Sequence, residues 1–131
     1  MKTSEASGTS NATTSNFDEE TIYYIYRIQI ELLEKYNIII FNPKKIIDHI
    51  LQEAFKIKNT INYSNKDFIQ NIHIQYEKVI ITYNNSETNK LFIDEINNNL
   101  KTFFPNVNFK KNQIIKSVIV FYYKHLINLN Q

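Results

Sequence analysis

The chain has 131 residues, enough for one compact domain or for two very small intertwined units. Hydrophobic residues make up 43% of it, and a single glycine, Gly8, excludes Gly-rich phosphate loops and dinucleotide-binding motifs. Cysteine is absent, which excludes disulfides and thiolate chemistry, and the net charge of +2 is too small to indicate nucleic acid by itself.

The residue usage is strongly biased. Ile, Asn and Lys are abundant and Arg27 is the only arginine, which is typical of an AT-rich coding sequence such as a viral or plasmid genome. Lys can therefore occupy positions where a protein from a less biased genome would have Arg. Residues 78–131 hold seven lysines against three carboxylates, whereas residues 1–77 hold eight basic and ten acidic side chains, so the second half is the basic one.

No apolar run reaches the length of a membrane span, and the N-terminus lacks the pattern of a signal peptide. We therefore expect an intracellular, cytoplasmic protein (in the host cell if it is viral) without a membrane partner. Residues 1–16 are rich in Ser, Thr and Asn and are expected to be a disordered tail.

Residues 17–70 are expected to form a helical hairpin. Apolar residues recur at helical spacing from about Asp18 to Tyr36. Asn42-Pro43 then marks a second helix, with Asn as N-cap and Pro at the first helical position, ending near Lys58. A short helical turn is expected at residues 64–70.

From Ile72 the apolar period changes to two, which indicates extended chain up to Asn84. The phase slips near Glu77-Lys78, so either a hairpin turns there or one longer strand contains a bulge. Both geometries point Val79, Ile81 and Tyr83 towards the core.

Two further helices follow, at about 87–103 and 111–127, separated by the helix-stopping Pro105. Sliding the chain by 68 residues superposes these helices on the first pair without a gap, so a duplication is one explanation. The other is that two helical hairpins of similar length resemble each other because each buries one apolar face. The segment that then aligns with residues 77–84 is Thr9–Asn16, which is polar and poorly suited to a strand.

The order strand, helix, turn, helix over residues 77–128 resembles the ribbon-helix-helix family of DNA-binding proteins. The likeness is closest in the last helix, with Ile114-Ile115, Lys116, Val118, Ile119 and Tyr122. The expected fold is mainly α with a short β ribbon: a ribbon-helix-helix-like unit at 71–131, preceded by the helical hairpin. The first half then serves as a degenerate repeat that completes a tandem pseudo-dimer, as a dimerisation or effector module, or as part of a different fold.

The resemblance implies a sequence-specific DNA-binding protein, a transcriptional regulator of a viral or plasmid type, that acts as a homodimer on double-stranded DNA. In this family one strand face reads bases in the major groove, and the start of the second helix holds a phosphate. The matching residues are Lys78, Ile80, Thr82 and Asn84 on the strand, and Lys110, Lys111 and Asn112 at the helix start. Lys44 and Lys45 occupy the corresponding helix start of the first half.

Two alternatives stay open. A winged helix, with a hairpin at 71–84, is another DNA-binding arrangement, and a protein-interaction module that binds a host factor belongs to a different class. Enzyme activity, cofactors and small-molecule substrates are not expected, because His49, His73 and His125 lack partners at metal-ligand spacing.

Overall fold

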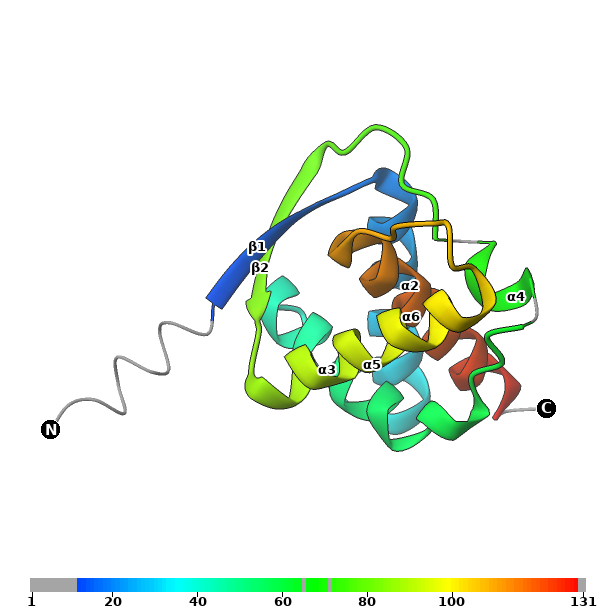
Figure 1. Ribbon diagram of the computed structural model, residues 1–131. Coiled ribbons are helices and arrows are strands. Elements are labelled where there is room, and N and C mark those ends of the chain that lie inside the picture. The colour runs from blue at the N-terminus through cyan, green and yellow to red at the C-terminus, as the bar shows by residue number, and fades with distance from the viewer. Residues whose placement is uncertain (1–11, 65, 71, 130–131) are drawn as a thin grey trace, which may run out of the picture.

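The computed structural model describes residues 12–64, 66–70 and 72–129. Two strands, β1 (Ala12–Phe17) and β2 (Val79–Asn84), form one antiparallel sheet. The helices are α2 (Glu19–Tyr36), α3 (Pro43–Lys56), α4 (Lys66–Ile69), α5 (Glu87–Phe103) and α6 (Lys111–Asn128), with a short 3-10 helix η1 at Lys58–Thr60. The protein is therefore mainly helical with a small two-stranded sheet, as the sequence predicts (Figure 1).

Strand β1 is the main departure from the sequence prediction. The disordered tail predicted for residues 1–16 is wrong for Ala12–Asn16, which form most of β1, while residues 1–11 lie outside the described chain. The partner of β1 is distant in sequence: the ladder runs from Ala12 opposite Asn84 to Phe17 opposite Val79. Paired backbone groups and the fully buried Phe17 ring stabilise a strand whose other side chains are small and polar.

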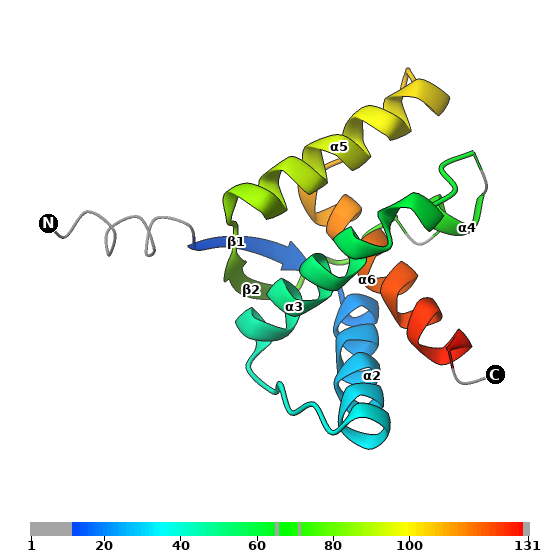
Figure 2. The same cartoon turned by 90° about the horizontal axis from the view of Figure 1, so that it is seen from below.

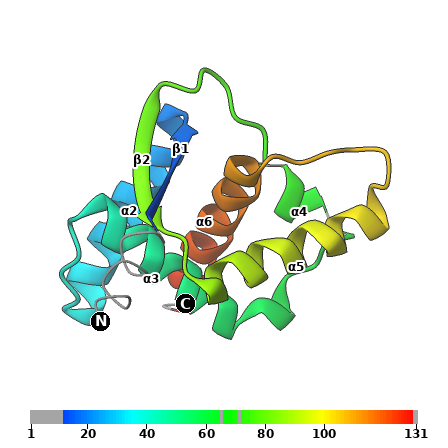
Figure 3. The same ribbon diagram turned by 60° about the vertical axis from the view of Figure 1, so that its left-hand side comes forward.

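The segment before β2 is irregular. Residues 72–78 contain neither the predicted hairpin nor the longer bulged strand, and they form a connector that arches away from the helices (Figures 1 and 3). Alternation predicted a strand there, but among the described residues β1 pairs with β2 alone, and only the Lys78 N–H continues the ladder, with a bond to the Phe17 oxygen at 3.0 Å. The winged-helix alternative therefore loses the hairpin that it requires.

Capping side chains mark the start of α2 and α3, as predicted for Asn42. Asp18 accepts a hydrogen bond from the Thr21 backbone N–H at 2.8 Å, and Asn42 accepts one from the Lys44 N–H at 2.9 Å. Helix α5 ends at Phe103, two residues before Pro105. The four long helices are thus confirmed to within two residues at each end, as is the short turn now seen as α4.

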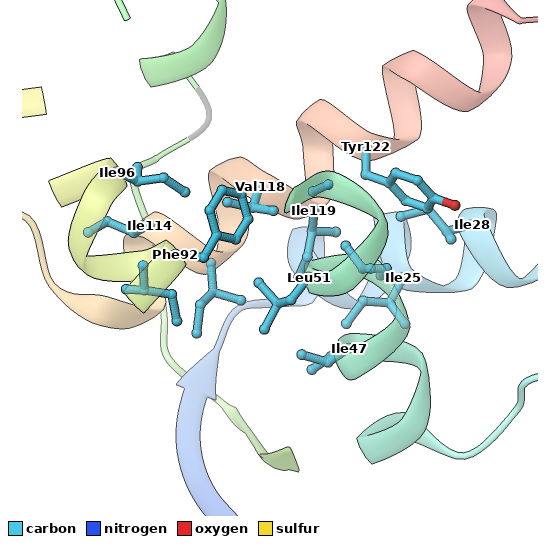
Figure 4. Packing of buried hydrophobic residues seen from close by; sticks show 14 of the residues in the cluster. Ile25, Ile28, Ile47, Leu51, Phe92, Ile96, Ile114, Val118, Ile119 and Tyr122 are labelled. Carbon is cyan, nitrogen blue, oxygen red and sulfur yellow. The ribbon is translucent and has the colours of Figure 1, made fainter. Parts of the chain in front are cut away.

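One buried cluster joins both halves of the chain. Helix α6 packs against α2, α3 and α5, and α3 runs between α2 and α5 (Figure 2). The rings of Phe55 and Phe92 meet edge-on with centroids 5.4 Å apart, which links α3 to α5. Figure 4 shows apolar side chains from all four helices converging: Ile25, Ile28, Ile47, Leu51, Phe92, Ile96, Ile114, Val118, Ile119 and Tyr122. Residues 17–70 and 71–131 therefore share a single core.

The two halves also repeat in their element boundaries. The first long helix of each half begins at Glu19 and at Glu87, and the second begins at Pro43 and at Lys111. Both intervals equal the 68-residue offset found in the sequence. Each half therefore contains, in the same order, a strand, a long helix and a second long helix.

Candidate nucleic-acid interface

The two-stranded ribbon has one buried and one exposed face. Ile81 and Tyr83 of β2 lie in the core with 6% and 0% exposure, and Val79 is half-buried, which confirms the predicted inner face. The intervening side chains point outward: Ile80 is 70% exposed and Thr82 is also exposed. In Figure 3 the two paired strands lie along one flank of the helices.

Strand β1 contributes as much to the outer face as β2. Ala12, Thr14 and Asn16 are exposed and alternate with half-buried or buried neighbours. Thr14 lies directly opposite Thr82, and Asn16 lies opposite Ile80. These β1 residues were missed as site residues in the sequence analysis; the signal that identifies them is the 68-residue offset, which aligns Asn16 with Asn84 and Thr14 with Thr82.

The centre of the ribbon coincides with the centre of the repeat. In an antiparallel ladder related by a twofold axis, only one residue pairs with its own equivalent. Thr14 pairs with Thr82, and the two are 68 positions apart, the same interval that separates the helix starts. The pairing register and the helix boundaries thus define the same relation between the halves.

The start of α6 lies beside β1. The Asn112 side chain is buried and its Nδ2 donates a hydrogen bond to the Asn16 backbone oxygen at 2.6 Å. The side chain of Asn112, predicted to contact nucleic acid, is thus used inside the protein. Lys110 and Lys111 are exposed, and the Lys110 N–H donates to Gln113 Oε1 at 2.8 Å.

The start of α3 lies beside β2. Asn42, Pro43 and Lys44 line a groove together with residues 79–82 of that strand. The Asn42 side chain caps the helix through the N–H groups of Lys44 and Lys45, at 2.9 and 3.3 Å. Lys44 and Lys45 are exposed, so each strand of the ribbon has a lysine-bearing helix start next to it.

Lys116 does not belong to the basic surface. It is 1% exposed, and its Nζ lies 2.8 Å from Asp18 Oδ2 and 2.6 Å from Glu20 Oε1. It also donates to the His73 backbone oxygen at 2.8 Å. One of the seven lysines that make the second half basic is therefore internal and neutralised by carboxylates of the first half.

Burial and pairing act in opposite directions on this ion pair. Burial raises the pKa of Asp18, but hydrogen bonds from Lys116, Thr21 and Gln75 outweigh it and bring the pKa below 3.8. Burial lowers the pKa of Lys116, but the carboxylates of Asp18 and Glu20 outweigh it and bring the pKa above 10.5. Both groups are therefore charged at neutral pH.

A different polar link occupies the equivalent place in the other half. Asp48 is the position that corresponds to Lys116, and its Oδ1 accepts a hydrogen bond from Asn89 Nδ2 at 3.0 Å. The same Asn89 amide donates to the Asn84 backbone oxygen at 2.8 Å. Lys116 of α6 thus contacts the start of α2, and Asp48 of α3 contacts the start of α5. In both halves the second long helix is bonded to the start of the first long helix of the other half.

The three histidines do not form a metal site. His49 and His125 both lie against the Tyr122 ring, with centroids 6.3 and 6.4 Å away, while His73 is exposed in the connector. Burial lowers the pKa of His49 and raises the pKa of Tyr122 to about 12. Over residues 12–64, 66–70 and 72–129, three or more potential metal ligands nowhere come together.

Comparisons with protein-family models, with curated proteins and with solved structures give no match. In the described part of the chain, none of the helices has both the length and the apolar character needed to cross a bilayer. Function therefore has to be inferred from the ribbon and from the helix starts beside it.

Proposed function

We propose that this single chain is a tandem ribbon-helix-helix pseudo-dimer that binds double-stranded DNA in a sequence-specific way, as a transcription regulator does. The observation that carries the proposal is the pairing of Thr14 with Thr82. Two ribbon-helix-helix units joined in one chain require their strands to pair about a twofold axis. They also require the helix starts to repeat at the same interval, and here both conditions hold for an offset of 68 residues.

The exposed ribbon face has the shape and chemistry for the major groove. A two-stranded ribbon fits that groove, and Asn and Thr side chains can hydrogen-bond to base edges there, Asn typically to adenine. Thr14 and Thr82 occupy the centre, with Asn16 towards one end and Asn84 towards the other. We assign base recognition to these four residues and to Ile80, and we place Lys78, which is exposed just before β2, at the end of the same face.

The helix starts beside the ribbon supply the phosphate contacts. Backbone N–H groups at a helix N-terminus attract anions, and contacts to phosphates fix the register of a protein on DNA. Lys44 and Lys45 lie at the start of α3, and Lys110 and Lys111 at the start of α6. In this arrangement one lysine pair holds the DNA backbone on each side of the ribbon.

The pseudo-dimer makes the expected homodimer unnecessary for ribbon formation. Strand β1 takes the place that a second chain's strand would occupy opposite β2. We therefore propose that the DNA-binding unit is one chain.

Salt dependence tests the DNA-binding proposal. If four lysines each neutralise a phosphate, the logarithm of the binding constant falls with the logarithm of salt concentration with a slope of about −3.6. Sites selected from random duplexes, followed by anisotropy titrations at several salt concentrations, measure this slope. Lys44→Ala and Lys110→Ala each make this slope less steep by about one. Lys101→Ala, at an exposed position on α5, leaves the slope unchanged. Failure to select any sequence at low salt contradicts the proposal.

A protein partner is a second candidate, favoured by one observation. An apolar groove of about 550 Å³ runs beside β2, lined by Ile22, Ile25, Phe41 and Pro43, and the exposed Tyr26 and Ile80 border it. Such a groove next to a strand edge suits a peptide segment. Phe41→Ser would then abolish partner binding that is insensitive to salt, whereas under the DNA proposal it leaves DNA affinity within about twofold.

A further inference from the structure

Within the paired residues 12–16 and 80–84, the two halves of the ribbon's exposed face differ at a single pair of equivalent positions. Under the 68-residue offset Thr14 corresponds to Thr82, Asn16 to Asn84, and Ala12 to Ile80. The first two correspondences are identical residues. In the third, Ala12 has only a methyl group, whereas its equivalent Ile80 has a much larger side chain that is 70% exposed.

The pairing register places these residues at opposite ends. Ile80 lies across from Asn16 at one end, and Ala12 lies across from Asn84 at the other. Each end therefore presents one asparagine, but only one end also presents a large apolar side chain. Among these paired residues, the outward-facing side chains have the same hydrogen-bonding groups and different apolar groups; Asn16 is exposed and Asn84 is half-buried.

Ile80 borders the apolar groove beside β2, and most of its side chain is exposed to solvent. Its neighbours Ile81 and Val79 contact the core, whereas Ile80 stands on the outer face between Lys78 and Thr82. In the major groove an apolar side chain has one specific partner, the C5-methyl group of thymine. Ala12 is too short to cover the same methyl group to a similar extent.

We infer that this protein reads an imperfect inverted repeat, in which both half-sites carry an adenine for Asn16 or Asn84 and only one half-site requires a thymine methyl, for Ile80. This inference rests on the proposed DNA binding. It makes Ile80 the residue that determines specificity between the two half-sites. It also implies that one chain binds its site in a single orientation, which a symmetric homodimer cannot do.

Replacing thymine by deoxyuridine gives the test, because deoxyuridine lacks the methyl group and keeps the same hydrogen-bonding groups. The probe is the duplex selected from random sequence by the full chain, with single replacements in either half-site. Loss of one buried methyl contact is expected to weaken binding about three- to fivefold in the Ile80 half-site. Replacement at the mirror position leaves the affinity unchanged.

Two variants with opposite effects provide the controls. Ile80→Ala abolishes the sensitivity to deoxyuridine in the first half-site. Ala12→Ile creates the same sensitivity in the second half-site, and because both positions are exposed, neither change disturbs the core. Circular dichroism of both variants confirms that they are folded.

The outcomes separate this inference from the proposed function. Specific binding with equal sensitivity in both half-sites, or with none in either, overturns the inference and leaves DNA binding intact. Sensitivity that persists in Ile80→Ala overturns the role of Ile80. Absence of any selected sequence overturns both.

Discussion

The ammonium group of Lys116 on α6 lies 2.8 Å from the carboxylate of Asp18, the N-cap residue of α2, and both side chains are almost fully buried. This ion pair joins residues that are 98 positions apart in the sequence, and it links α6 to the residue that directly follows β1. The same two side chains also bind the connector, Lys116 through the His73 oxygen and Asp18 through the Gln75 N–H. Three distant segments thus meet at one pair of charges.

Lys116→Met is expected to destabilise the protein by about 3–5 kcal/mol, because it leaves the Asp18 carboxylate buried without its counter-charge. The double variant Lys116→Met/Asp18→Ser is expected to recover most of this loss, since Ser is the N-cap at the equivalent position, Ser86. Urea unfolding measures both free energies.

The matched control for this pair is Glu20→Gln. Glu20 also contacts Lys116, but its side chain is 55% exposed, so its loss costs at most about 1 kcal/mol. If Lys116→Met is no more destabilising than Glu20→Gln, the buried pair does not have the structural role described above.

Phe17→Ala tests whether β1 is part of the folded domain. Phe17 is fully buried at the end of the strand, so its truncation is expected to cost about 3–5 kcal/mol. Ile80→Ala, on the exposed face of the opposite strand, is expected to change stability by less than about 0.5 kcal/mol. Equal stability of the Phe17→Ala variant and the parent chain in urea would mean that residues 12–17 are not packed as described.

His49 makes stability depend on pH in mildly acidic solution. Burial is the main effect and lowers its pKa below 6.5, opposed by the carboxylates of Glu53 and Asp48 and assisted by Lys56. The unfolded chain therefore binds a proton at a higher pH than the folded chain. The contribution of His49 to the free energy of unfolding is fully present above about pH 6.5, and it is lost as the pH falls through the folded-state pKa of this residue.

His49→Gln is expected to remove this contribution. Thermal unfolding between pH 7 and pH 5 then shows a smaller fall for the variant than for the parent chain. An identical fall in both proteins contradicts the prediction. At lower pH, the lowered pKa of Asp18 adds a second loss, as the pH falls from about 3.8 through its folded-state pKa.

The proposed pseudo-dimer predicts a complex of one chain with one DNA duplex. Since β1 and β2 of the same chain form the ribbon, no second chain is needed to complete it. Sedimentation of the protein with its selected duplex is expected to give a one-to-one complex at concentrations just above the dissociation constant. A complex of two chains with one duplex, without a one-to-one intermediate, contradicts the proposal that a single chain is the DNA-binding unit.

The helices could be predicted closely because local signals specify them. Apolar residues at helical spacing predicted the four long helices, and the Asn42-Pro43 pair located the start of α3; Asp18 and Ser86 cap α2 and α5 in the structure. The inner face of β2 was also predictable, because the alternation of Val79, Ile81 and Tyr83 needs only knowledge of one strand.

Strand β1 could not be predicted from its own residues. Ala12–Asn16 offers no large apolar side chain, and its extended form depends on a ladder with residues 64 to 72 positions away. Conversely, residues 72–77 alternate well and form no strand, because alternation does not supply a pairing partner. Two residues of the candidate site, Thr14 and Asn16, could not be predicted for the same reason. The internal role of Lys116 was equally invisible, since its carboxylate partners belong to the other half.

The most direct test of the central claim is the affinity of Asn16→Ala and Asn84→Ala for the selected duplex, at one salt concentration and with Asn98→Ala as the control. Asn98 is exposed on α5, away from the ribbon, whereas Asn16 and Asn84 stand at the two ends of its outer face. Each ribbon variant is expected to lose about five- to 150-fold in affinity for the selected site and to keep its weak affinity for random DNA. Unchanged affinity in both ribbon variants, with their folding intact, contradicts the claim that this ribbon reads DNA.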